Sequence, residues 1–173
     1  MMVLADRSHF QLLYERYANR LYWYAIARTG SEAAADDIVS DTMLTAYENL
    51  HRFDAKRGSF AAWVFRIGQR KTLDHQRAHQ RIRRLLTRAR QQTGPRHEVD
   101  TLDHILDQER ALEVRRAVAT LPGGDREIIA LRYAAGFSGK EIADHLGVSH
   151  AAARKRLSRA LQRLASRLEE QPQ

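Results

Sequence analysis

The chain has 173 residues, a formal net charge of +8 and no cysteine, which excludes disulfides and thiolate metal sites. The excess of basic over acidic residues favours a polyanionic partner, a nucleic acid more than a membrane surface. Charged residues come too early for a signal peptide and no 18 apolar residues run together, so the sequence predicts a cytoplasmic protein with no membrane insertion.

Three helices are predicted in the first part of the chain. Between residues 6 and 28, apolar and aromatic residues recur every three or four positions, and a glycine then supplies a stop. Ser31 can cap a second helix, which carries an apolar stripe along one face. A polar loop over residues 51–59 leads into a third helix that starts at Phe60 and runs towards Leu73.

The composition changes after this block. Arginines flank a few apolar residues there, and residues 78–100 are predicted to be a basic linker. Residues 101–170 then carry four helical segments separated by glycine and proline stops, with Asp125 placed to cap the second of them. No strand pattern is present. The prediction is an all-α fold of two small helical domains, three helices over 1–77 and four over 101–170, tethered flexibly.

The segment from Ser138 to Leu157 has the spacing of a helix-turn-helix. Ser138 and Glu141 form a capping-box pattern, Gly147 stands where a left-handed residue ends the first helix, and Ser149 can cap the second. That second helix is basic on its outer face, which either enters the major groove of DNA or is simply solvated. The candidate groove residues are Ser149, His150, Ala151, Arg154, Lys155, Arg156, Ser158 and Arg159.

Four motifs follow one another along the chain. They are F-x-x-L-Y-E-R-Y-A-N-R-L-Y from Phe10, A-A-D-D-I-V-S-D-T-M-L-T-A-Y from Ala34, F-A-A-W-V-F-R-I from Phe60, and L-P-x-x-x-R-E-I-I-A-L-R-Y from Leu121 into the helix-turn-helix. In order and spacing they resemble the extracytoplasmic-function (ECF) sigma factors, the compact branch of the sigma-70 family. The resemblance implies a specificity subunit that carries core RNA polymerase to promoter DNA, with no catalysis, no cofactor, and an anti-sigma factor as a further partner.

The same resemblance assigns roles to three groups of residues. The second helix would dock on the clamp of core RNA polymerase through Asp36, Asp37, Ser40, Asp41 and Glu48. The second domain would read the minus-thirty-five duplex, and the linker would lie towards the RNA exit path. Trp63 is expected in the core, because buried aromatics at helical spacing are commoner than stacking platforms. The loop before the third helix and that helix would melt and read the minus-ten region through Phe53, Lys56, Arg57, Ser59, Arg66, Arg70, Lys71 and Arg77.

Two other classes of function each fit part of the sequence. A stand-alone helix-turn-helix regulator accounts for residues 138–157 and the charge, but leaves the first half of the chain unexplained. An enzyme would need the carboxylates of residues 36–41, or Asp74 and His75 with His79, to complete a metal or catalytic site. Neither set supplies the paired ligand motifs or the nucleophile and base that such sites require, so we predict a protein that is not an enzyme and holds no metal.

Overall fold

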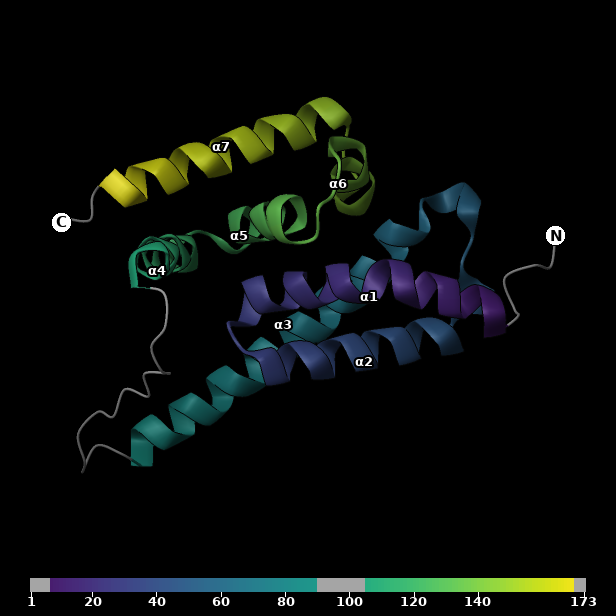
Figure 1. Ribbon diagram of the computed structural model, residues 1–173, viewed down its shortest axis with the longest axis horizontal. Coiled ribbons are helices and arrows are strands. Elements are labelled where there is room, and N and C mark those ends of the chain that lie inside the picture. Colours follow the sequence, from purple (N-terminus) through teal and green to yellow (C-terminus); the bar gives the residue numbers. More distant parts are fainter. Residues whose placement is uncertain (1–6, 90–104, 170–173) are drawn as a thin grey trace.

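The computed structural model describes residues 7–89 and 105–169, and within those ranges it contains helices and no strand (Figure 1). The predicted all-α fold is confirmed. The first region contains α1 (Arg7–Thr29), α2 (Glu32–Glu48) and α3 (Phe60–Ala89), with two short 3-10 turns, η1 (Leu50–Arg52) and η2 (Ala55–Arg57), before α3. The second contains α4 (Ile105–Thr120), α5 (Gly123–Ile129), η3 (Ala130–Ala134), α6 (Gly139–Leu146) and α7 (His150–Glu169).

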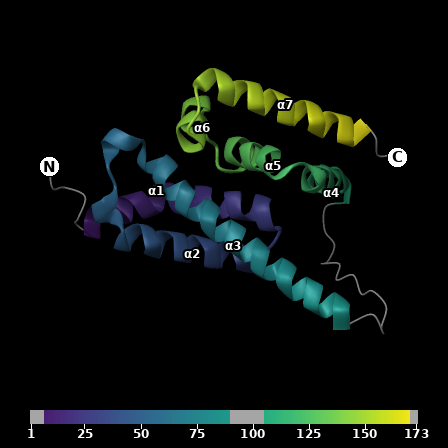
Figure 2. The ribbon, with the colours of Figure 1, turned by 180° about the vertical axis from the view of Figure 1, so that it is seen from behind.

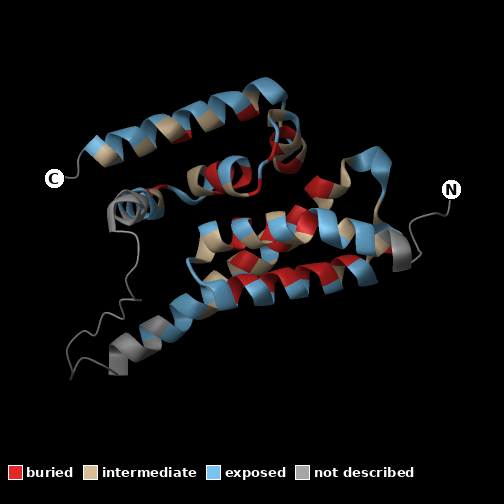
Figure 3. Ribbon diagram, in the orientation of Figure 1, coloured by how far each residue is buried: buried red, intermediate tan, exposed pale blue. Residues whose placement is uncertain are grey.

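Local signals start and stop the helices of the first region. The Ser31 hydroxyl accepts a hydrogen bond from the backbone N–H of Ala34 at 3.3 Å, which caps α2 as predicted. One face of α2 is buried against α1 and the other is open to solvent (Figure 3). Where α3 crosses α1, Gly68 allows a close approach, because a Cβ there would lie 2.9 Å from Cδ2 of Leu21 and that side chain would have to shift.

Helix α3 continues well past Leu73, the predicted limit, and reaches Ala89. Its final turns extend beyond the ends of α1 and α2, and Arg81, Ile82 and Arg84 are exposed there (Figure 1). The reason is that residues 69–89 contain neither glycine nor proline, and arginine and leucine are good helix formers. The rest of the predicted linker lies outside the described residues.

Helix α5 starts differently from the prediction. Its N-cap is Pro122, with an extended ψ of 147°, so Asp125 lies inside the first turn and does not cap the helix. Asp125 instead forms an ion pair with Arg163 of α7 at 2.5 Å. Helix α5 runs into the π-helical turn η3, where the N–H of Ala135 donates to the carbonyl of Ala130 at 2.9 Å.

The helix-turn-helix is built from the local signals that predicted it. The Ser138 hydroxyl accepts from the N–H of Glu141 at 3.2 Å, and the Glu141 carboxylate accepts from the N–H of Ser138 at 2.8 Å. Gly147 ends α6 with a φ of +64°, a left-handed conformation that glycine adopts without a Cβ clash. The Ser149 hydroxyl then accepts from the N–H of Ala152 and caps α7.

The two helical regions also pack directly against each other. A single apolar core joins Leu21, Tyr24 and Phe65 of the first region to Leu131 and Phe137 of the second, and the rings of Phe65 and Phe137 lie 4.6 Å apart. Seen from behind, α5 and α6 lie against α1 and α3, with α7 as the outermost layer (Figure 2). The expectation of two bodies held together only by a flexible tether therefore misses this shared core.

Candidate DNA and polymerase interfaces

Helix α7 turns an apolar face inward, where Leu157, Leu161 and Leu164 are partly buried against the core, and exposes its opposite side. Ala153 and Ala160 are buried against the second region. At roughly 100° per residue, Arg154 and Ser158 flank this apolar face on one side, and Ala151 and Lys155 point away from it; all four are exposed. Ser149 and His150 are exposed at the start of the helix, where a Cβ on Gly139 would lie 2.6 Å from Nε2 of His150.

Two candidate groove residues of α7 face another way. Arg156 and Arg159 lie on the opposite flank of the apolar face from Arg154, and both line a cleft between α7 and the first region. The cationic set assigned to DNA from the sequence is thus divided between an outer flank and an inner flank of the same helix.

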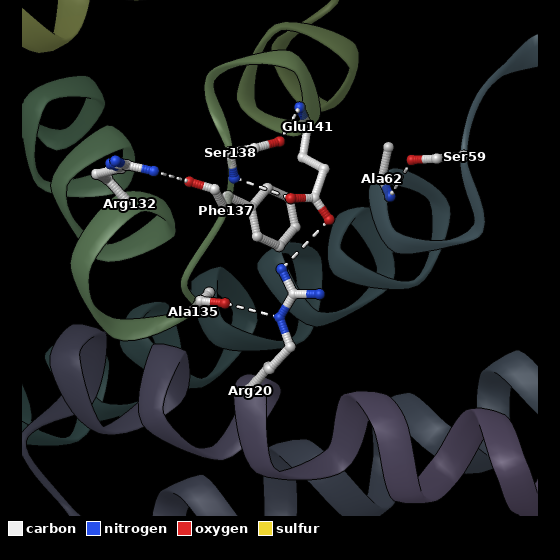
Figure 4. Close-up of polar contacts among 8 residues, drawn as sticks. All are labelled: Arg20, Ser59, Ala62, Arg132, Ala135, Phe137, Ser138 and Glu141. Atoms are coloured by element: carbon white, nitrogen blue, oxygen red, sulfur yellow. Dashed lines mark hydrogen bonds and ion pairs between the residues drawn. The ribbon is translucent and has the colours of Figure 1, made fainter.

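In the loop before α3, some of the candidate minus-ten residues are exposed and others make local structural contacts. Lys56 and Arg57 are exposed on η2. The Phe53 ring is half-buried and packs on the rings of Phe60 and Trp63, at 5.3 and 5.5 Å between centroids. The Ser59 hydroxyl accepts from the N–H of Ala62 at 3.1 Å, so it caps α3 (Figure 4). Trp63 is partly buried against the core.

The cationic residues along α3 have different partners. Arg66 donates to the backbone carbonyls of Asp144 at 2.7 Å and His145 at 3.3 Å, which ties α3 to α6. Lys71 lies 3.5 Å from the carboxylate of Asp41, and Arg77 lies 3.3 Å from that of Asp74. Arg70 is exposed.

The candidate polymerase face forms one continuous side of α2. Asp36, Asp37, Ser40, Asp41 and Glu48 are all exposed, and at roughly 100° per residue they fall within a single arc of about 140°. Two residues that the sequence analysis did not single out lie in the same arc, Leu44 with 58% exposure and Tyr47 with 45%. An apolar residue at helical spacing inside an acidic face was the signal that would have identified them.

A polar contact between the regions centres on Arg20 of α1, which sequence reasoning missed. Its Nε donates to the carbonyl of Ala135 at 2.7 Å, its Nη2 donates to Glu141 at 3.4 Å, and its guanidinium lies 4.9 Å from the Phe137 ring (Figure 4). Partial burial raises the pKa of Glu141, but the hydrogen bonds from Ser138 and the charge of Arg20 outweigh it, and the pKa lies below its ordinary value.

A second, buried contact centres on Glu127 of α5. The Tyr24 hydroxyl donates to its carboxylate at 2.8 Å, Nε of Arg28 lies 3.3 Å away, and Nε2 of His145 lies 3.6 Å away. Burial, together with the negative charge of Glu127, raises the pKa of Tyr24 well above its usual range. Glu127 belongs to a sequence motif but has no role predicted from the sequence, because its partners lie on two distant helices, α1 and α6.

Within residues 7–89 and 105–169, no group of three or more histidine, cysteine or acidic residues is arranged to hold a metal ion. The rings of His75 and His79 stack at 6.4 Å on α3. No helix in the same ranges is long and apolar enough to cross a membrane.

Two protein-family models match the chain. The model described as Sigma-70 region 2 matches residues 13–82, and the one described as Sigma-70, region 4 matches residues 111–164. The ECF RNA polymerase sigma factor SigF of Caulobacter vibrioides is 34% identical over 152 residues, which cover 86% of this chain and 79% of SigF. The chain belongs to the ECF sigma factors of the sigma-70 family.

Further similarities extend over nearly all of this sigma factor. The ECF RNA polymerase sigma factor SigL of Mycobacterium tuberculosis is 28% identical over 96% of this chain and 92% of SigL. The structure of CnrH in complex with the cytosolic domain of CnrY has a TM-score of 0.70 and 29% identity, over 96% of this chain and 92% of CnrH. The sigma factor RpoE in complex with the anti-sigma factor NepR, from Bartonella quintana, has a TM-score of 0.65 over 94% of this chain and 98% of RpoE, and at 23% identity it shows the fold alone.

The resemblance read from the motifs is therefore confirmed. The protein is an alternative sigma factor that directs transcription initiation, and no observation favours a stand-alone regulator. Sigma factors regulate transcription and are not enzymes.

Proposed function

We propose that this sigma factor works in the cytoplasm and divides its work between three surfaces. The acidic face of α2, with Leu44 near its centre, binds the clamp of core RNA polymerase. The loop before α3, together with the cations along that helix, opens and reads the minus-ten region, so residues 1–77 serve both tasks. Within residues 101–170, the outer flank of α7 reads the minus-thirty-five duplex.

The capped helix-turn-helix is the observation that best supports this proposal. Helix α7 begins with a capped, exposed N-terminal turn, and its outer side carries Arg154 and Lys155. Within residues 7–89 and 105–169 neither side chain takes part in an ion pair, so both are available for guanine edges or phosphates. Ala151 leaves room for close approach of the helix to the base edges.

Promoter binding requires the two regions to separate. The two promoter elements are roughly 25 base pairs apart, a distance of about 85 Å at 3.4 Å per base pair. In the packed form Arg66, a proposed minus-ten residue, is hydrogen-bonded to carbonyls of α6. We therefore assign the packed form to the resting state. The partner expected to hold it is an anti-sigma factor, the kind of protein found in complex with the RpoE of Bartonella quintana.

Run-off transcription with core RNA polymerase over a pool of promoter fragments tests the proposed function. The wild-type chain should yield transcripts that share upstream motifs, and Arg154→Ala with Lys155→Ala should weaken promoter binding by about 1–3 kcal/mol if a base edge is read. The control pair is Arg115→Ala with Arg116→Ala, which removes the same charge from exposed positions of α4. Equal losses from both pairs would refute the DNA-reading flank proposed for α7.

A further inference from the structure

A cleft of about 560 Å³ lies between α7, α5 and the first region. Small-molecule sites in proteins have volumes of roughly 300 to 1,000 Å³, so this cleft is of the right size for one. Its walls come from five helices of the two regions: Arg28 of α1, Gln69 of α3, Arg126 of α5, Leu146 of α6 and Arg156 of α7 are among the residues that line it. The cleft is formed only while the two regions are packed together.

The walls of the cleft are strongly cationic. Five arginines line it, and the acids among its lining residues are Asp125 and Glu127. Asp125 is paired with Arg163, and Glu127 with Arg28. The remaining three, Arg126, Arg156 and Arg159, form no ion pair within the described residues. Because a guanidinium keeps its charge at every pH in which a protein folds, the cleft holds an excess of fixed positive charge.

Part of this charge is buried without hydrogen-bond acceptors. The Arg28 side chain is 4% exposed, and its Nη1 is buried with no hydrogen-bond partner. Nε of Arg126 is buried and without a partner in the same way. Neither atom is open to the cleft, but buried cationic charge that is only partly compensated is costly, and an anion bound beside it in the cleft lowers that cost.

We propose that this cleft binds a small molecule that carries two or more phosphate groups. Arginine matches the oxygens of a phosphate with two parallel hydrogen bonds. Arg156 and Arg159 lie one turn apart on α7 and Arg126 lies on α5, so the unpaired cations are spread over more than one phosphate-sized position. Leu73 and Leu146, both partly exposed, supply apolar wall where an organic part of the ligand fits.

This site goes beyond the proposed promoter function. A ligand held by arginines of α7 lies against the first-region wall of the cleft, lined by Gln69 and Gln76 of α3. It thus bridges the two regions and binds the packed form in preference to the separated one. It therefore shifts the population towards the packed form by the difference between its affinities for the two states. A metabolite of this class would then lower promoter binding without touching DNA.

Isothermal titration calorimetry of the full chain with sodium tripolyphosphate, at about 150 mM salt to screen loose ionic contacts, tests the proposal. We expect one saturable site. Arg156→Gln with Arg159→Gln should weaken binding by about tenfold or more, whereas Arg154→Gln with Lys155→Gln, the same charge change on the outer flank, should change it by less than about twofold. Titration without saturation, or equal losses from the two pairs, overturns the proposal.

Two further ligands identify what is recognised. If ATP binds more tightly than tripolyphosphate, the apolar wall binds an organic group. If the two affinities are equal, the phosphates alone are recognised. If adenosine binds as tightly as either, the proposal is overturned. Both variant pairs change exposed side chains. Thermal unfolding is a second measurement of the same site: tripolyphosphate should raise the unfolding midpoint of the wild type but not that of Arg156→Gln with Arg159→Gln. No polymerase or promoter enters these assays, so their failure leaves the proposed function standing.

Discussion

Arg20 combines three interactions that hold the two regions together. Its Nε and Nη2 donate to a carbonyl of the chain after η3 and to the Glu141 carboxylate, and its planar cation stacks near Phe137. Arginine suits this position because one guanidinium can donate in several directions while packing on an aromatic ring. A lysine would keep the charge but lose the fork and the planar packing surface.

The pH dependence of stability should report on Glu141. Because its folded-state pKa lies below the ordinary 4.5, the carboxylate stabilises the protein above that pH, and this contribution is lost as the pH falls through the folded-state pKa. Glu141→Gln should therefore lower the free energy of unfolding by about 0.5–1 kcal/mol at neutral pH. The gap from the wild type should shrink as the pH is lowered below 4.5, measured by urea unfolding.

Glu113→Gln is the control for that experiment. Glu113 is exposed on α4 and takes part in no ion pair within the described residues. Its variant should track the wild type at each pH. A gap between Glu141→Gln and the wild type that stayed constant down to low pH would contradict the role given to the Glu141 charge.

At the scale of the element, α2 has two faces of different composition. Its inner face buries Ile38, Val39 and Met43 against its neighbours. Its outer face combines four carboxylates with the exposed Leu44 and Tyr47. An apolar centre ringed by charge is the usual composition of a protein–protein interface, in which buried contacts set affinity and the rim sets orientation and association rate.

Charge reversal on α2 should weaken polymerase binding while the fold is kept. Asp37→Lys with Asp41→Lys places two cations where a basic partner helix is expected, and we predict at least a tenfold loss of affinity, about 1.4 kcal/mol, in a pull-down with core RNA polymerase. Both positions are exposed, and Asp41 loses only its contact with Lys71.

The matched control is Glu113→Lys with Glu169→Lys, which makes the same change of net charge at exposed positions of α4 and α7. This pair should bind core RNA polymerase as the wild type does. If it loses as much affinity as the α2 pair, the effect is one of overall charge and the proposed face on α2 is wrong.

At the scale of the whole molecule, the packed arrangement engages part of the surface proposed for the minus-ten region, because Arg66 donates to carbonyls of α6. Arg156 and Arg159, on the inner flank of α7, line the cleft beside α5. The interface between the two regions has an apolar part around Phe65 and Phe137 and two polar parts around Arg20 and Glu127. Release of the polar contacts is therefore expected to favour separation of the regions.

Small-angle X-ray scattering tests this expectation. A packed chain of this length has a radius of gyration of about 16 Å. Arg20→Ala with Arg66→Ala removes contacts from α1 to η3 and α6 and from α3 to α6, and the radius should rise by several ångström, roughly the change that partial separation of two such bodies gives. Arg16→Ala with Arg70→Ala, exposed positions on the same two helices, should leave it unchanged. An equal radius for both pairs would mean that the apolar core alone holds the packed form.

The sequence by itself determined the helices, their caps and the helix-turn-helix. These depend on signals within a few residues, such as Ser138 with Glu141 or the left-handed Gly147, which local geometry decides. It also placed the acidic face of α2, since spacing alone fixes which residues share a side. Asp125 is the exception, because a proline upstream moved the start of α5.

Only the tertiary structure decided how the two regions meet. Arg20 contacts Ala135 and Glu141 across 115 and 121 positions of chain, and no local pattern specifies such pairs. The same holds for the ring of arginines around the cleft, which come from α1, α5 and α7. Helical periodicity says that Arg156 and Arg159 leave the core on one side of α7, but only the packing of α7 over the first region decides that this side faces a cleft and not solvent.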